Sequence, residues 1–142
     1  MSTYADDFVA WAEAQVQALR AGRLDALDVE HLAEEIESMG ERDRREVRSR
    51  LRVLLAHLLK WHFQPDYRGS SWVRTIDEQR DELADVLARS PSLWHVVRDD
   101  FARCYEQGRR TALKETGLPA TSVPQSCPYS IEQVLDADFL PG

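Results

Sequence analysis

The sequence predicts an all-α protein: four to five mostly antiparallel helices in a bundle, followed by an irregular C-terminal strap. Nearly every segment of the 142 residues repeats its apolar positions with the helical period, and no segment alternates as a strand does. Hydrophobic residues make up 43% of the chain and charged residues 30%, which supplies a core and excludes a disordered tail. We expect residues 1–117 to form the bundle and residues 118–142 to form a strap of the same domain.

The first two helices are predicted from caps and glycines. The first covers residues 5–21, with Thr3 as its N-cap and Gly22 as its end. The second follows Asp28, an N-cap residue, and Gly40 marks its end or a kink. Its period turns one apolar stripe inward, consisting of Val29, Leu32, Ala33, Ile36 and Met39.

The longest amphipathic run predicts a third helix over residues 41–63, which stops before Pro65. A short loop then leads to a fourth helix that begins at Ser70 or Ser71. Short loops of this kind join antiparallel neighbours in a bundle.

The fifth helix begins where Ser90 precedes Pro91, and it ends at Gly117. Three prolines make the strap extended, and Ser130 with Gln133 forms a capping box for one short helix within it. The central stripe positions of the bundle predict one contact cluster, made of Trp11, Leu54, Leu58, Ile76, Leu83, Val97 and Phe101.

Charge is distributed unevenly along the chain. The net charge of −7 divides into −8 for residues 1–41, +5 for residues 42–80 and −4 for residues 81–142. The densest basic feature is a candidate patch of five arginines, Arg42, Arg45, Arg48, Arg50 and Arg52. These arginines could bind phosphates, or they could form ion pairs with neighbouring acidic residues on the same helix. Since no aromatic residue alternates with them to stack bases, the pattern disfavours nucleic acid as a partner.

Motifs for catalysis and for metal binding are weak. Of the four histidines only His62 lies near a stripe centre, and the helical period turns His31 toward solvent, so we expect no metal site. Cys104 lies at the edge of a core stripe and Cys127 is in the strap, without a Cys-x-x-Cys pattern. A serine nucleophile elbow and a phosphate-binding glycine loop are both missing from the sequence. We therefore expect no catalytic residue and no cofactor.

Four polar residues occupy positions where the pattern favours apolar ones: Gln15, Arg44, His62 and Gln79. They could form an internal hydrogen-bond network, with Gln15 or Gln79 as the partner of His62. Alternatively, they could form the floor of a small pocket walled by Trp11, Trp61 and Trp72.

Several segments resemble a known bacterial family. They include residues 31–40 (HLAEEIESMG), 58–65 (LLKWHFQP), 115–119 (ETGLP) and 127–133 (CPYSIEQ). In this order and spacing the chain resembles the domain of unknown function 29 family over essentially its whole length. The resemblance implies a small all-helical bacterial protein, and it implies no reaction.

These observations favour a non-enzymatic binding or protein-interaction module, with a protein partner or a second copy of the chain bound. One alternative is a small-molecule or metal-binding bundle around His62, and another is a nucleic-acid-associated protein that uses Arg42–Arg52. No apolar run is long enough to span a membrane and the N-terminus lacks the basic start of a signal peptide, so we expect a cytoplasmic protein.

Overall fold

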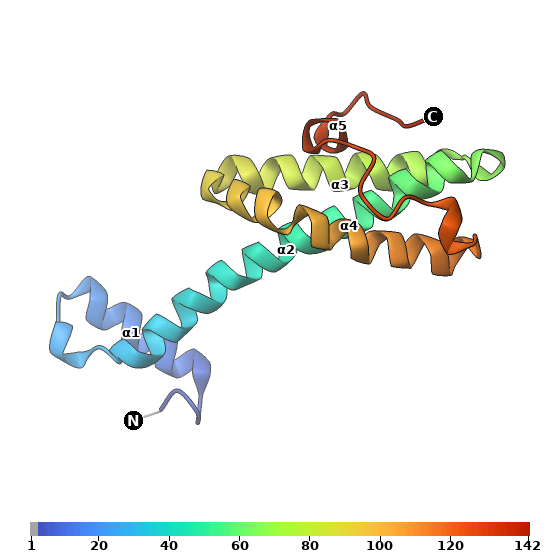
Figure 1. Cartoon of the computed structure of the whole chain (residues 1–142). Coiled ribbons are helices and arrows are strands. Elements are labelled where there is room, and N and C mark those ends of the chain that lie inside the picture. The colour runs from blue at the N-terminus through green and yellow to red at the C-terminus, as the bar shows by residue number, and fades with distance from the viewer. Residues whose placement is uncertain (1–2) are drawn as a thin grey trace. The chain divides into compact units, whose positions relative to one another are not determined.

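A computed structural model describes residues 3–142, and within that range the chain is helical and contains no strand (Figure 1). The five α-helices are α1 (Phe8–Arg20), α2 (Val29–Phe63), α3 (Ser70–Arg89), α4 (Trp94–Thr116) and α5 (Ile131–Leu135). Short 3₁₀ turns lie in the segments between them. The all-α prediction is confirmed.

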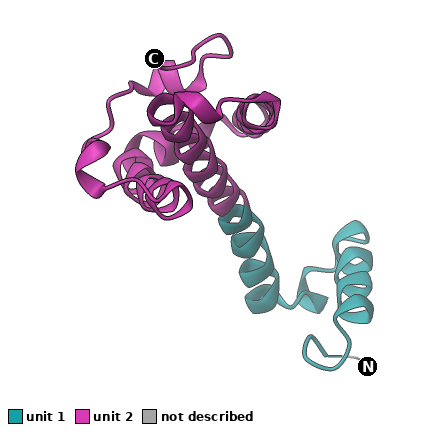
Figure 2. Cartoon of the chain, turned by 90° about the vertical axis from the view of Figure 1, so that its right-hand side faces the viewer, with its two compact units in different colours: residues 1–42 teal, residues 43–142 magenta. Residues whose placement is uncertain are grey.

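The chain divides into two compact units, residues 1–42 and residues 43–142 (Figure 2). Helix α2 crosses the boundary, so its first part belongs to one unit and its second part to the other. The division into residues 1–117 and 118–142 stays a prediction.

In the first unit, α1 is shorter than predicted. It begins after Asp7, whose carboxylate accepts a hydrogen bond from Ala10 N (3.1 Å), so Asp7 is the N-cap. Thr3 instead closes the preceding turn, where its hydroxyl accepts from Asp6 N. The predicted stop at Gly22 is confirmed, because this glycine has a φ of +70° directly after the helix ends.

Helix α2 runs through Gly40, so the helix does not end there, and the predicted second and third helices are one helix. A single interior glycine costs about 1 kcal/mol relative to alanine, which is too little to end a helix flanked by strong helix formers. Asp28 stands at the start as predicted, and its Oδ1 accepts from His31 N (3.4 Å).

In the second unit, α3, α4 and the C-terminal part of α2 lie side by side around one apolar core (Figure 1). The successive helices run antiparallel, so α2 and α4 run in the same direction. Six of the seven residues of the predicted cluster are in this core or packed against it. The seventh residue, Trp11, was wrongly assigned to this cluster. It is buried in the first unit, where its Nε1 donates to Asp28.

Glycine at two positions fixes the geometry of α4. Gly117 ends the helix with a φ of +72°, as predicted. Gly108 lies where α4 meets α2, and a Cβ at this position would be only 2.9 Å from the carbonyl oxygen of Arg52. The start of α4 differs from the prediction, because Pro91 begins a 3₁₀ turn and the α-helix follows at Trp94.

The strap passes over the outside of the second unit and contributes to its core through Val123, Tyr129 and Val134. The capping box is confirmed: Ser130 Oγ accepts from Gln133 N (3.1 Å), and Gln133 Oε1 accepts from Ser130 N (2.9 Å).

Candidate functional site

The predicted polar residues do not converge on one site. Gln15 is buried in the first unit, where its side-chain oxygen accepts from Asp28 N (2.7 Å). Gln79 is half-buried on α3 and accepts from Arg50 (3.3 Å). Arg44 is half-buried on α2. The expectation that Gln15 or Gln79 would be the partner of His62 is therefore wrong.

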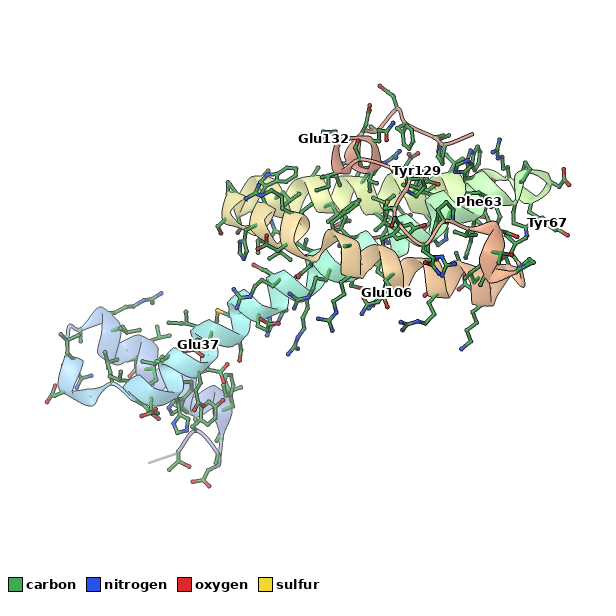
Figure 3. All side chains as sticks on the ribbon, in the orientation of Figure 1. Glu37, Phe63, Tyr67, Glu106, Tyr129 and Glu132 are labelled. Carbon is green, nitrogen blue, oxygen red and sulfur yellow. The ribbon has the colours of Figure 1, made fainter. Side chains whose placement is uncertain are left out.

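His62 pairs with the strap instead. Its Nδ1 lies 2.8 Å from the Tyr129 hydroxyl, and its ring stacks on Phe63 with the centroids 4.1 Å apart. Figure 3 labels Phe63 near the end of α2 and Tyr129 on the strap. Burial, and then the nearby charge of Arg68, lowers the pKa of His62, while burial raises the pKa of Tyr129. The Tyr129 hydroxyl can donate a hydrogen bond to the neutral imidazole, so this pair attaches the strap to the end of α2.

The predicted pocket tryptophans make different contacts, and Trp11 lies in the first unit, where it donates to Asp28. Trp61 lies beneath the guanidinium of Arg68, 5.0 Å from the ring centroid, and its carbonyl oxygen accepts from Arg68 Nε (2.7 Å). Trp72 lines a hollow of about 340 Å³ with Gln64 and Tyr67. The hollow that Trp72 lines includes neither His62 nor Trp61.

Sequence reasoning missed the buried arginine of α3. Arg80 is only 5% exposed; its Nε donates to Val134 O (2.8 Å) and its Nη2 to Gln133 O (3.4 Å). It follows Ile76 by four residues and precedes Leu83 by three, so its position on the apolar stripe was visible in the sequence. Arg80 caps the carbonyl end of α5 and connects the strap to α3.

The five predicted basic-patch residues separate into different environments. Arg42 is exposed in the first unit. Arg50 contacts Glu46 on its own helix and Glu82 on α3. The remaining three, Arg45, Arg48 and Arg52, line an open groove of about 570 Å³ between α2 and α4.

The groove has one wall from each helix, and both walls repeat with the same helical spacing of i, i+3, i+4 and i+7. The α2 wall consists of Arg45, Arg48, Ser49 and Arg52, and the α4 wall of Asp100, Arg103, Cys104 and Gln107. Four guanidinium groups therefore face one carboxylate. Arg103 is a groove residue that sequence reasoning did not nominate.

Contacts at the base hold the two walls close together. The Cys104 thiol donates to Arg48 O (3.6 Å), and Arg48 lies 3.4 Å from the Asp100 carboxylate. Burial raises the pKa of the Cys104 thiol, which favours its protonated form. Within residues 3–142, neither Arg52 nor Arg103 makes a side-chain hydrogen bond or an ion pair.

In the first unit, polar and aromatic side chains join α1 to α2. Asp28 Oδ2 accepts from Trp11 Nε1 (3.0 Å) and lies 2.7 Å from His31 Nδ1. Tyr4 stacks on His31 with the ring centroids 4.1 Å apart, and its hydroxyl donates to Glu35. Asp28 raises the pKa of His31, and His31 lowers that of Asp28. The prediction that His31 faces solvent is therefore wrong, because this ring belongs to the contact between the helices.

Most apolar side chains of the first unit remain exposed. Within residues 3–42, Trp11, Gln15 and Ala18 are the buried residues. Val29, Ile36 and Met39, predicted to point inward, are 68%, 66% and 58% exposed. On α1 the exposed large apolar residues are Phe8, Val9, Val16 and Leu19. We call these seven residues of α1 and α2 the apolar face.

Within the described residues we find no group of three or more histidine, cysteine or acidic side chains that could hold a metal ion. None of the described helices combines the length and the apolarity that a membrane crossing requires.

The fold and these sites define a small all-helical protein with an apolar face on one unit and an arginine groove on the other. The model of one family, described as "Domain of unknown function DUF29", matches residues 3–140. The chain belongs to this family. Neither the curated proteins nor the solved structures include a match.

Proposed function

We propose that the protein is a non-enzymatic interaction module that self-associates through the apolar face of its first unit. The supporting observation is where the exposed apolar residues lie. Among the described residues, eight of the eleven exposed large hydrophobic side chains belong to residues 8–39: the seven of the apolar face and Leu24. Concentration of exposed apolar surface on a small part of a chain marks an interaction site.

The exposed residues form a stripe on each helix. At about 100° per residue, those of α1 occupy a sector about 100° wide, and those of α2 a sector about 80° wide. Ala12 of α1 also falls in the first sector, and Ala33 and Gly40 of α2 lie at the edge of the second. Within residues 8–42, no charged residue of either helix falls in these sectors. Apolar stripes of this width normally pack against another helix.

The two stripes lie on the same side of the helix pair. Tyr4 contacts Glu35, whereas Trp11, further along the chain, contacts Asp28, so α1 and α2 run antiparallel. On each helix, a rotation of about 100° about the helix axis leads from the side that faces the other helix to the centre of the exposed stripe. Viewed from the N-terminus of each helix, this rotation has the same direction in both. Because the helices run in opposite directions, equal rotations bring both stripes to one side.

The exposed area matches what a dimer requires. Full burial of one large aliphatic or aromatic side chain corresponds to about 60–120 Å² of apolar area. The seven side chains are 44–68% exposed, and together they therefore present on the order of 250–500 Å². A standard interface buries about 800 Å² per partner, of which about 450 Å² is apolar.

A second copy of the chain is the partner that suits this surface. The apolar face lacks the charges that would select a different protein, and homodimer interfaces are more apolar than other interfaces. Two antiparallel helix pairs that meet face to face form a four-helix bundle with twofold symmetry.

Sedimentation equilibrium of wild type and of two single variants tests the proposal. Ile36→Glu should shift the dimer to monomer, because two carboxylates would then enter an apolar interface. Ser38→Glu is the matched control, since Ser38 is exposed on the opposite side of the same helix and should leave the dimer intact. Circular dichroism checks that both variants remain helical. A wild type that stays monomeric, or equal dissociation of both variants, would refute self-association through this face.

Salt provides a second measurement. Residues 1–42 carry ten acidic residues and three arginines, so two copies repel each other through their flanks. Added potassium chloride screens this repulsion and should strengthen the dimer. Salt-induced dissociation would instead indicate association by opposite charges, and it would contradict the proposed apolar interface.

A further inference from the structure

We infer that the groove between α2 and α4 is a binding site for a small ligand that carries a phosphate or diphosphate group. This site belongs to the second unit, and the inference does not depend on self-association through the first. The groove volume of about 570 Å³ is within the range of small-molecule sites.

The donor set of the groove suits phosphate oxygens. Guanidinium groups present N–H donors in a planar fork that can bind two oxygens of one phosphate. Arg52 extends from the α2 wall and Arg103 from the α4 wall, so a ligand in the groove can be held from both sides. Ser49 and Gln107 add neutral donors.

The charge of the groove selects the class of anion. Four arginines and Asp100 leave a local charge of +3. A single carboxylate carries one negative charge, whereas a phosphate monoester carries about 1.5–2 near neutral pH. A phosphate or diphosphate group therefore compensates the groove better than one carboxylate does.

Two groove arginines remain available for a ligand. Arg48 already contacts Asp100 at 3.4 Å. Arg52 and Arg103 have no hydrogen-bonding or ion-pairing partner for their side chains within residues 3–142. Ligand binding at these two groups breaks no existing ion pair.

The walls are supported by packing at their base. Gly108 permits α4 to approach the α2 backbone at Arg52, and the Cys104 thiol contacts the backbone of α2 one turn earlier. Val47 and Leu51, on the core side of the same α2 segment, are fully buried. The arginines therefore project from helices that are fixed in place, which limits the ordering that a ligand must impose.

Isothermal titration of the full-length protein with inorganic pyrophosphate tests the site. Wild type should give saturable binding that weakens with added salt. Arg52→Gln and Arg103→Gln should each reduce the affinity about ten- to a hundredfold, which corresponds to the loss of one charge-assisted contact. Asp100→Asn should increase the affinity, because it removes the carboxylate that competes for the arginines.

Arg98→Gln is the matched control, since Arg98 is exposed on α4 and lies on the side opposite the groove. It removes the same charge and should leave the pyrophosphate affinity unchanged. No saturable binding of pyrophosphate, or equal losses in Arg98→Gln and Arg103→Gln, would overturn the inference.

Titrations with three further ligands identify the source of the phosphate. Inorganic phosphate, ATP, and phosphatidylcholine vesicles containing phosphatidic acid present the same chemistry as a free ion, a nucleotide and a lipid headgroup. Binding of any of these that Arg103→Gln weakens supports the site. A single-stranded oligonucleotide that binds while pyrophosphate does not compete for the groove would overturn it in favour of a nucleic-acid surface, whose affinity falls steeply with salt.

Discussion

Replacing Arg80 with methionine should destabilise the protein by about 2 kcal/mol, within a range of about 1–3 kcal/mol. Arg80 is the buried cation of α3, and two of its nitrogens donate to carbonyl oxygens at the end of α5. Methionine has nearly the same helix propensity as arginine and fills a similar volume with apolar atoms. The substitution therefore removes the hydrogen bonds and the charge while it leaves α3 intact.

The magnitude depends mainly on one bond. A hydrogen bond from a charged group contributes about 1.5–3 kcal/mol, and the 2.8 Å contact with Val134 O is of this kind. The 3.4 Å contact with Gln133 O contributes little. Burial lowers the pKa of Arg80, so the charged form is partly desolvated and its removal recovers part of the loss. The substitution also removes the positive charge near Asp136 and Asp77, which adds to the loss of stability.

Urea unfolding followed by circular dichroism measures the change as a lower midpoint at an unchanged slope. Arg74→Met is the control, because Arg74 is an exposed arginine on the same helix. Arg80→Lys keeps the charge but loses the planar fork, so its loss of stability should be intermediate. A free energy of unfolding for Arg80→Met equal to that for Arg74→Met would refute the role assigned to Arg80.

Three further substitutions test the packing and the pH response. Gly108→Ala should cost about 1–3 kcal/mol, because the new Cβ would lie 2.9 Å from Arg52 O and the helices must separate. Gly117→Ala should cost about 1 kcal/mol, since its φ of +72° is strained for alanine although the space is open. Thermal melts rank the two variants, and an equal or reversed order would contradict the helix-contact argument. His62 has a lowered pKa, so the unfolded state binds its proton first; the free energy of unfolding should fall as the pH drops below about 6.5. His62→Gln should flatten this part of the pH profile in urea titrations, and an unchanged slope would show that His62 does not cause it.

Local signals predicted much of the fold. The capping box of Ser130 and Gln133 and the stop at Gly117 depend only on residues near one another in the sequence, and both are confirmed. Gly40 was harder to interpret, because a glycine either ends a helix or is tolerated within it. An interior glycine costs only about 1 kcal/mol relative to alanine, so the neighbouring residues and the packing determine whether the helix continues.

The candidate sites were only partly predictable, because helix angles show which side a residue occupies and not what covers that side. The position of His62 on its helix was informative, but its partner Tyr129 is 67 residues away on the strap. Gln79 and Arg80 both lie on the apolar stripe of α3, and only the position of α5 makes Arg80 the buried one. The groove similarly required α4 to supply Arg103.

Helix α2 provides the clearest case of this distinction. One helical period connects Val29 and Ile36 with Val47, Leu54 and the positions that follow. The later residues are fully buried by α3 and α4, whereas Val29 and Ile36 are about two-thirds exposed. An apolar stripe that continues where the chain supplies no cover supports the proposal that a second copy of the chain covers it. The Ile36→Glu and Ser38→Glu pair tests this directly, because only Ile36 belongs to the stripe: if its charge left the dimer intact, the exposed part of the stripe would not be an interface.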